Sequence, residues 1–154
     1  MKQNANSQEH TYGKIYLDNN TIILERDNEE ILRLAVTELK LIGEFTTANG
    51  PIDDDWYIVF MTSEKNWYQI PEYTPGMLEL LQELSGVLRE DVMCSLFGST
   101  SWATRILWPK AVEGAEIWDI EPVPASTFFQ QVKRVFGMSH QSLILIPVAL
   151  RAFA

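Results

Sequence analysis

Short segments of alternating apolar and polar residues fill the first half of the chain, which is the pattern of half-buried β-strands. It predicts strands at residues 14–18, 21–26, 31–34, 38–45, 56–62 and 67–70. Asn19-Asn20 separates the first two strands, and asparagine tolerates the positive φ angles of a tight hairpin turn. Residues 56–62 are apolar on both faces, so this strand is expected in the centre of a sheet.

The segment 38–45 shows the alternation most clearly. One face carries Leu39, Leu41, Gly43 and Phe45. The other face carries Glu38, Lys40 and Glu44, with Ile42 as the exception. The pattern therefore predicts one apolar face and one polar face.

The period then changes from two residues to between three and four, which indicates an amphipathic helix. Thr74 can cap this helix and Pro75 can occupy its first position. The apolar stripe comprises Met77, Leu80, Leu81, Leu84, Val87 and Leu88. Gly86 weakens the last turn and can end the helix early.

The last third of the chain is less regular. Residues 92–97 are apolar and fit either a helix or a strand, whereas 105–108 and 115–120 predict a hairpin. A second amphipathic helix is expected after Ser126 or Thr127, and a final buried strand at 143–146. The pattern leaves open whether this last strand pairs within its own chain or with a neighbouring copy, which would make a homo-oligomer.

These elements define an α+β fold, mainly a curved antiparallel sheet with a helix after the first six strands. A hairpin, a second helix and a final strand follow. The order of elements over about residues 13–90 resembles the pleckstrin-homology-like architecture, in which a helix plugs a curved sheet. This resemblance implies a roll but no function, because sites are grafted onto folds. Residues 1–12 are polar and expected to be frayed, and 13–154 are expected to form a single domain.

Charge changes the picture, because the chain of 154 residues carries a net charge of -9. All 21 acidic residues precede position 122, and three basic residues follow it: Lys133, Arg134 and Arg151. An acidic body disfavours nucleic acid and anionic membranes, whose phosphates bind Lys and Arg. It favours a basic partner, although the same charge also serves solubility alone.

Cysteine content and the apolar runs indicate the compartment. Cys94 is the single cysteine, so an intrachain disulfide is excluded and a reducing compartment is favoured. The N-terminal residues lack the apolar run of a secretory signal. The apolar stretch 143–150 is too short to cross a bilayer, which needs about 20 residues. We therefore expect a cytoplasmic protein without membrane binding.

The acidic triplet Asp53, Asp54 and Asp55 is the densest charge cluster. In an extended segment Asp53 and Asp55 point to one side and Asp54 to the other, so the three do not readily share one ion. The spacing also lacks the pattern of a calcium-binding loop. The triplet predicts a solvated loop tip, and we expect no metal and no cofactor.

Nucleophilic catalysis requires a base, and the chain has only His10 and His140. His140 could serve Cys94, Ser99 or Ser101, but no Gly-x-Ser-x-Gly motif surrounds either serine. Cys94 lies in an apolar segment and is interpreted as a small core residue rather than a reactive thiolate.

Aromatic residues gather in one predicted hairpin and its exit: Trp56, Tyr57, Trp67, Tyr68 and Tyr73. If one face of this hairpin is open, Tyr57, Tyr68 and Tyr73 form an aromatic patch rimmed by Asp53 to Asp55. Such a composition is typical of protein interfaces. The alternative is that residues 91–154 cover this face.

Together these features favour a non-catalytic protein-interaction module that binds a basic partner. It would act as a neutraliser or adaptor of that partner, as an immunity protein or antitoxin does. Two alternatives stay open. One is a small hydrolase that uses carboxylates or His140, and the other is a sensor that holds a small apolar ligand in the curve of the sheet.

Overall fold

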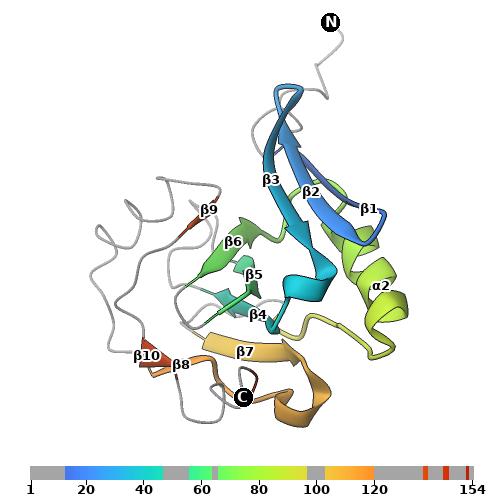
Figure 1. Cartoon of the computed structure of the whole chain (residues 1–154). Helices are drawn as coiled ribbons and strands as arrows, with labels where there is room; N and C mark the ends of the chain where they lie inside the picture. Colours follow the sequence, from blue (N-terminus) through green and yellow to red (C-terminus); the bar gives the residue numbers. More distant parts are fainter. Residues whose placement is uncertain are drawn as a thin grey trace, which may run out of the picture.

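The computed structural model describes residues 13–46, 56–63, 66–96 and 103–119, together with 137–138, 144–145 and 152. Within these ranges the fold is mainly antiparallel β-sheet with one α-helix (Figure 1). The first sheet has the order β1-β2-β3, formed by Lys14–Asp18, Thr21–Arg26 and Glu29–Ala35. The second has the order β7-β4-β5-β6-β9, formed by Ala103–Trp108, Leu41–Thr46, Trp56–Met61, Trp67–Pro71 and Gly137–Met138.

A further pair of short strands joins β8 (Trp118–Asp119) to β10 (Ile144–Leu145). The α-helix is α2 (Met77–Leu88), and two short 3-10 turns are η1 (Val36–Glu38) and η2 (Lys110–Val112). The α+β expectation is therefore confirmed at this level. The roll and the second helix at about 126–136 stay predictions, and that helix lies outside the described residues, as do residues 1–12.

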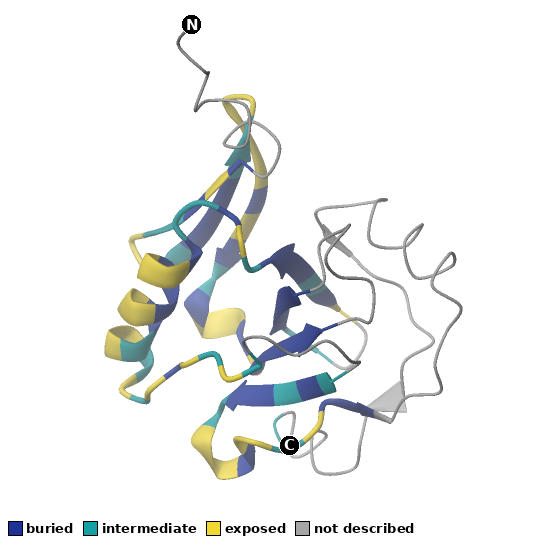
Figure 2. Ribbon diagram, turned by 180° about the vertical axis from the view of Figure 1, so that it is seen from behind, coloured by how far each residue is buried: buried dark blue, intermediate teal, exposed yellow. Residues whose placement is uncertain are grey.

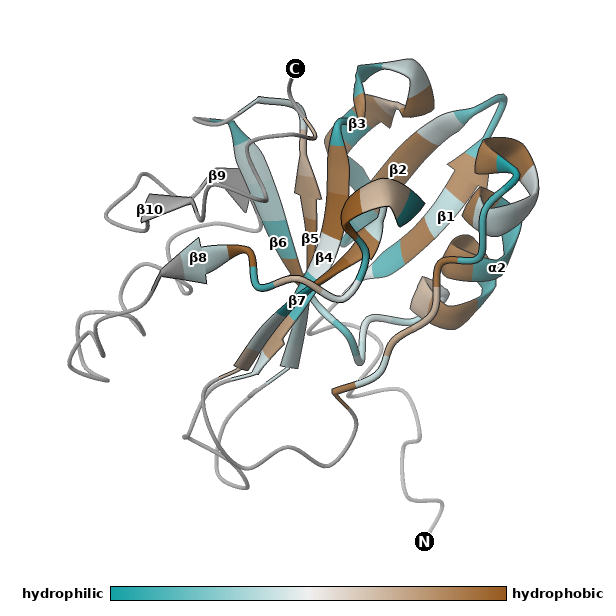
Figure 3. Cartoon of the chain, turned by 90° about the horizontal axis from the view of Figure 1, so that it is seen from below, coloured by the Kyte–Doolittle hydropathy of each residue, from teal (hydrophilic) through white to brown (hydrophobic). Residues whose placement is uncertain are grey.

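Both turns of the first sheet adopt the backbone that the sequence predicts. Asn19 and Asn20 have φ angles of 47° and 58°, and Asp27 and Asn28 have φ angles of 52° and 63°. Asparagine and aspartate tolerate this left-handed region, which matches the twist of two paired strands. Bands of apolar and polar residues cross these strands (Figure 3), and β2 carries three consecutive apolar residues, Ile22, Ile23 and Leu24.

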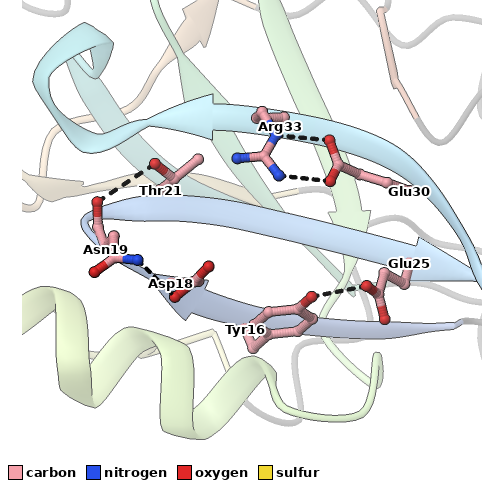
Figure 4. A network of polar contacts seen from close by, with 7 residues as sticks. All are labelled: Tyr16, Asp18, Asn19, Thr21, Glu25, Glu30 and Arg33. Carbon is pink, nitrogen blue, oxygen red and sulfur yellow. Dashed lines mark hydrogen bonds and ion pairs between the residues drawn. The ribbon is translucent and has the colours of Figure 1, made fainter.

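The outer face of the first sheet is polar but covers a buried residue. Tyr16 and Arg33 lie opposite Ile23 on its two sides, and Ile23 is only 2% exposed. Tyr16 donates a hydrogen bond to Glu25 at 2.8 Å, and Arg33 donates two to Glu30 at 2.7 and 2.8 Å (Figure 4). These contacts hold the tyrosine ring and the arginine stem over Ile23.

A β-bulge in β3 brings Glu30 and Arg33 together. The register shifts between Leu24 and Glu25, so that Leu24 opposes Leu32 while Glu25 opposes Glu30. Ile31 is the extra residue. In a regular strand, two residues that are three positions apart point to opposite faces of the sheet. The extra residue places Glu30 and Arg33 on the same face.

Strands β4 and β5 are buried on both faces along their whole length. The prediction that residues 56–62 form a central strand is confirmed. The predicted polar face of 38–45 is wrong, because residues 36–38 form η1, β4 begins at Leu41, and both Ile42 and Glu44 are completely buried. The second face of β4 is covered by elements far along the chain, which the alternation cannot reveal.

Two apolar clusters occupy the opposite faces of the second sheet. One includes Ile42, Ile58, Phe60 and Ile70 from the second sheet and residues of α2 and the first sheet. The other comprises Leu41, Phe45, Tyr57, Val59, Met61, Trp67, Ile106, Val112, Ile117 and Trp118. Helix α2 packs beside β1, with its inner side buried and its outer side exposed (Figure 2).

Helix α2 begins later than expected and ends at Leu88, the last residue of the predicted apolar stripe. Its N-cap is Gly76, with a φ angle of 91°, rather than Thr74. A side chain at Gly76 would collide with the carbonyl oxygen of Ile15. The backbone N–H of Ile15 donates a hydrogen bond to the Pro75 carbonyl at 2.9 Å. This close approach to β1 requires glycine. Gly86 lies in open surroundings, and the helix continues through it to Leu88.

The predicted hairpin between 105–108 and 115–120 is only partly correct. Ile106 donates to the Ala115 carbonyl at 2.8 Å and accepts from Gly114 at 2.9 Å, but Ile117 donates to the Thr104 hydroxyl instead of a backbone carbonyl. Strand β8 then pairs with β10, so the final strand pairs within its own chain. Residues 91–96 form neither helix nor strand.

Substitution of Leu84 by alanine should lower the free energy of unfolding by about 2–5 kcal/mol, because this side chain is completely buried and leaves a cavity. Leu78→Ala on the same helix is the matched control, since Leu78 is 62% exposed and its loss should cost less than about 0.5 kcal/mol. Urea unfolding measures both. Equal losses would contradict the burial pattern of α2.

Candidate functional site

The most unusual polar group in the described structure is the carboxylate of Glu44. It lies in the middle of β4, directly opposite Ile58 on β5 and Arg105 on β7, and it is 0% exposed. A buried charge is strongly destabilising unless its oxygens are hydrogen-bonded. The surroundings of Glu44 must therefore supply donors.

Four N–H and O–H donors of the described residues converge on this carboxylate. Oε1 accepts hydrogen bonds from the Ser95 backbone N–H at 2.6 Å, the Ser95 hydroxyl at 2.9 Å and the Leu96 N–H at 3.2 Å. Oε2 accepts from the Trp56 indole N–H at 3.0 Å. Arg105 makes no ion pair with Glu44 within the described residues. The carboxylate thus ties the segment that follows α2 to the centre of the second sheet.

Cys94 lies next to these donors and packs against the core. Burial, the nearby carboxylates of Glu44 and Glu72, and a hydrogen bond to Glu44 raise the pKa of the Cys94 thiol to about 12. The thiol is therefore protonated at neutral pH. Because the thiolate is the nucleophilic form, Cys94 is not a reactive cysteine in this structure.

Glu72 and Tyr73 form the outer edge of the same region. The Glu72 backbone N–H donates to the Trp56 carbonyl at 3.0 Å, which extends the pairing of β5 and β6. Burial and the charge of Glu44 raise the pKa of the Glu72 carboxyl. The Tyr73 ring meets the Trp56 ring edge to face, at 6.4 Å between centroids, and stays 52% exposed. We call Trp56, Glu72 and Tyr73 the Tyr73 corner.

The structure does not bring the three predicted tyrosines together. Tyr57 is only 2% exposed and stacks on Phe45 at 4.9 Å, on the face of the sheet that Val112, Ile117 and Trp118 also occupy. Tyr68 packs against the cluster on the opposite face. Tyr73 is the exposed tyrosine. Tyr57 is instead covered by residues from the 91–154 part of the chain, which was the alternative to an open face.

Several candidate residues lie outside the described residues: Asp53, Asp54, Asp55, His10, Ser99, Ser101 and His140. In the sequence Asp55 directly precedes Trp56. The described part of the chain contains no group of three or more His, Cys, Asp or Glu residues that could hold a metal ion. It also contains no helix that is long and apolar enough to cross a membrane.

Glu44 is the residue that the sequence pattern missed, since alternation placed it on a polar face with Glu38 and Lys40. The exception at Ile42 was the available sign, because Ile42 and Glu44 share that face and both are completely buried. Comparison of the chain with protein-family models, curated proteins and solved structures found no significant match.

Glu44→Gln should lower the free energy of unfolding by about 2 kcal/mol or more, because one of the four donors would face an amide N–H instead of an oxygen. Glu79→Gln, on the exposed side of α2, is the matched control and should change stability by less than about 0.5 kcal/mol. Urea unfolding compares the two variants. If Glu44→Gln proves as stable as Glu79→Gln, the hydrogen bonds of the Glu44 carboxylate do not stabilise the fold.

Cys94 should be alkylated by iodoacetamide at least about tenfold more slowly in the native protein than in urea, because a pKa of about 12 leaves little thiolate. Mass spectrometry follows the reaction. The native rate should keep rising above pH 9, whereas the rate in urea levels off there. A native rate that levels off at the same pH would mean that access alone, and not the pKa, protects the thiol.

Proposed function

We propose that the protein is a non-catalytic interaction module whose acidic surface binds a basic protein partner, as a neutraliser or adaptor of that partner. The observation that carries the proposal is the Tyr73 corner. There an exposed tyrosine rests on Trp56 and follows Glu72, and in the sequence Asp53 to Asp55 directly precede Trp56. An aromatic ring with an acidic rim suits the cationic side chains of a partner.

The electrostatics of the corner support this choice of partner. Glu72 and the buried Glu44 repel each other, which contributes to the raised pKa of Glu72. A lysine or arginine brought to the corner would offset this repulsion and favour the ionised form of Glu72. The net charge of -9 would steer such a partner toward the protein.

Two groups that an enzyme could have used are occupied otherwise. The Glu44 carboxylate is completely buried and accepts hydrogen bonds from Trp56, Ser95 and Leu96, and the Cys94 thiol is protonated. Neither is free to act on a substrate in this structure. The hydrolase alternative therefore rests on His140 and on other carboxylates, and His140 lies outside the described residues.

Affinity capture from the native cell extract tests the proposal. The tagged protein should retain one basic protein at low salt, and Tyr73→Ala or Asp53→Lys should reduce the recovery by about tenfold. Recovery should also fall in higher salt and as the pH decreases toward the raised pKa of Glu72, because protonation removes its charge.

Two matched variants separate the corner from charge in general. Glu79→Lys changes the net charge as much as Asp53→Lys does but lies on α2, and Leu78→Ala removes an exposed apolar side chain there. Both should leave the recovery unchanged. Equal losses for Glu79→Lys and Asp53→Lys, or no specific partner at any salt concentration, would contradict the proposal.

A further inference from the structure

A pocket of about 620 Å³ opens at the start of β1, and its lining includes none of the three residues of the Tyr73 corner. Three segments line it: the start of β1, the end of β2 with the following turn, and the turn before α2. The lining residues are Gly13, Lys14, Glu25, Asp27, Asn28, Pro75 and Gly76. The volume falls in the range of small-molecule sites, which is about 300–1,000 Å³.

The walls of this pocket are held by backbone contacts. Gly13 and Gly76 have φ angles of 76° and 91°, and a side chain at either would collide with a carbonyl oxygen, that of Glu25 or Ile15 respectively. The Ile15 N–H donates to the Pro75 carbonyl at 2.9 Å. The turn before α2 is thus fixed against β1, and the pocket exists before any ligand binds.

The pocket presents charges of both signs that do not neutralise each other by contact. Tyr16 donates to Oε1 of Glu25, and no described donor bonds Oε2. Asp27 lies 3.9 Å from the Arg26 Nε, an exposed and long contact. The Lys14 ammonium lies over the Tyr16 ring, 5.3 Å from its centre, and makes no ion pair with Glu25 or Asp27 in the described structure.

We propose that this pocket binds a small zwitterion of the α-amino acid class, with its ammonium group at Glu25 and Asp27 and its carboxylate at Lys14. A simple anion would be repelled by the two carboxylates. A metal ion would be repelled by the ammonium group of Lys14, which lines the same pocket. A zwitterion satisfies both signs, and the space beyond its charged groups accommodates a side chain.

Titration of the isotope-labelled protein with free leucine, followed by NMR, tests the proposal. The amide signals of Gly13, Lys14, Asn28 and Gly76 should shift and saturate at millimolar ligand. N-acetyl-leucine lacks the ammonium group and leucinamide lacks the carboxylate, so neither should produce saturating shifts. No saturable shift with leucine, or equal binding of a blocked analogue, would overturn the proposal.

Variants test the assigned charges. Lys14→Ala and Glu25→Gln should each weaken leucine binding by about tenfold, the usual scale for losing a charge-assisted hydrogen bond. Glu25→Gln retains an oxygen that can accept from Tyr16, so the first sheet is preserved. Lys40→Ala removes an exposed lysine outside the pocket and should bind leucine normally. Unchanged binding by Lys14→Ala or Glu25→Gln would overturn the assignment.

Discussion

The architecture depends on covering both faces of β4 and β5. All six residues of each strand are buried, and the two apolar clusters lie on opposite sides of them. One cluster includes residues of α2 and the first sheet, and the other includes Val112, Ile117 and Trp118 from the segment that follows β7. Each of these elements has one apolar side, and packing that side against the central strands removes it from water.

Glu44 is the polar exception within this arrangement, and its environment explains how a charge persists there. Its two oxygens accept bonds from Trp56, Ser95 and Leu96, which belong to two segments distant in the sequence. The same carboxylate raises the pKa values of Cys94 and Glu72. Glu44 therefore adds to the effect of burial on the Glu72 carboxyl at the Tyr73 corner.

The exposed edge of the first sheet is protected by its own chemistry. Strand β3 pairs only with β2 among the described strands, so it offers an edge to other chains. The bulge at Ile31 and the charges of Glu29 and Glu30 disrupt the regular edge that an additional strand would need. Addition of a further strand at this edge is therefore disfavoured.

Local chemistry was readable from the sequence alone. The turns at Asn19-Asn20 and Asp27-Asn28, the central position of residues 56–61 and the apolar stripe of α2 each follow from the preferences of consecutive residues. The exposure of the three tyrosines could not be read in this way. Tyr57 is buried beside Phe45, whereas Tyr73 is half exposed.

The sequence by itself determined where the chain turns and which side of the helix is apolar, because these depend on residues that are neighbours along the chain. Only the tertiary structure decided that Glu44 is buried, that Ile31 forms a bulge and that β8 pairs with β10. In each case the deciding contact comes from another segment of the chain. Periodicity describes how one strand divides into two faces, and it carries no information about what covers them.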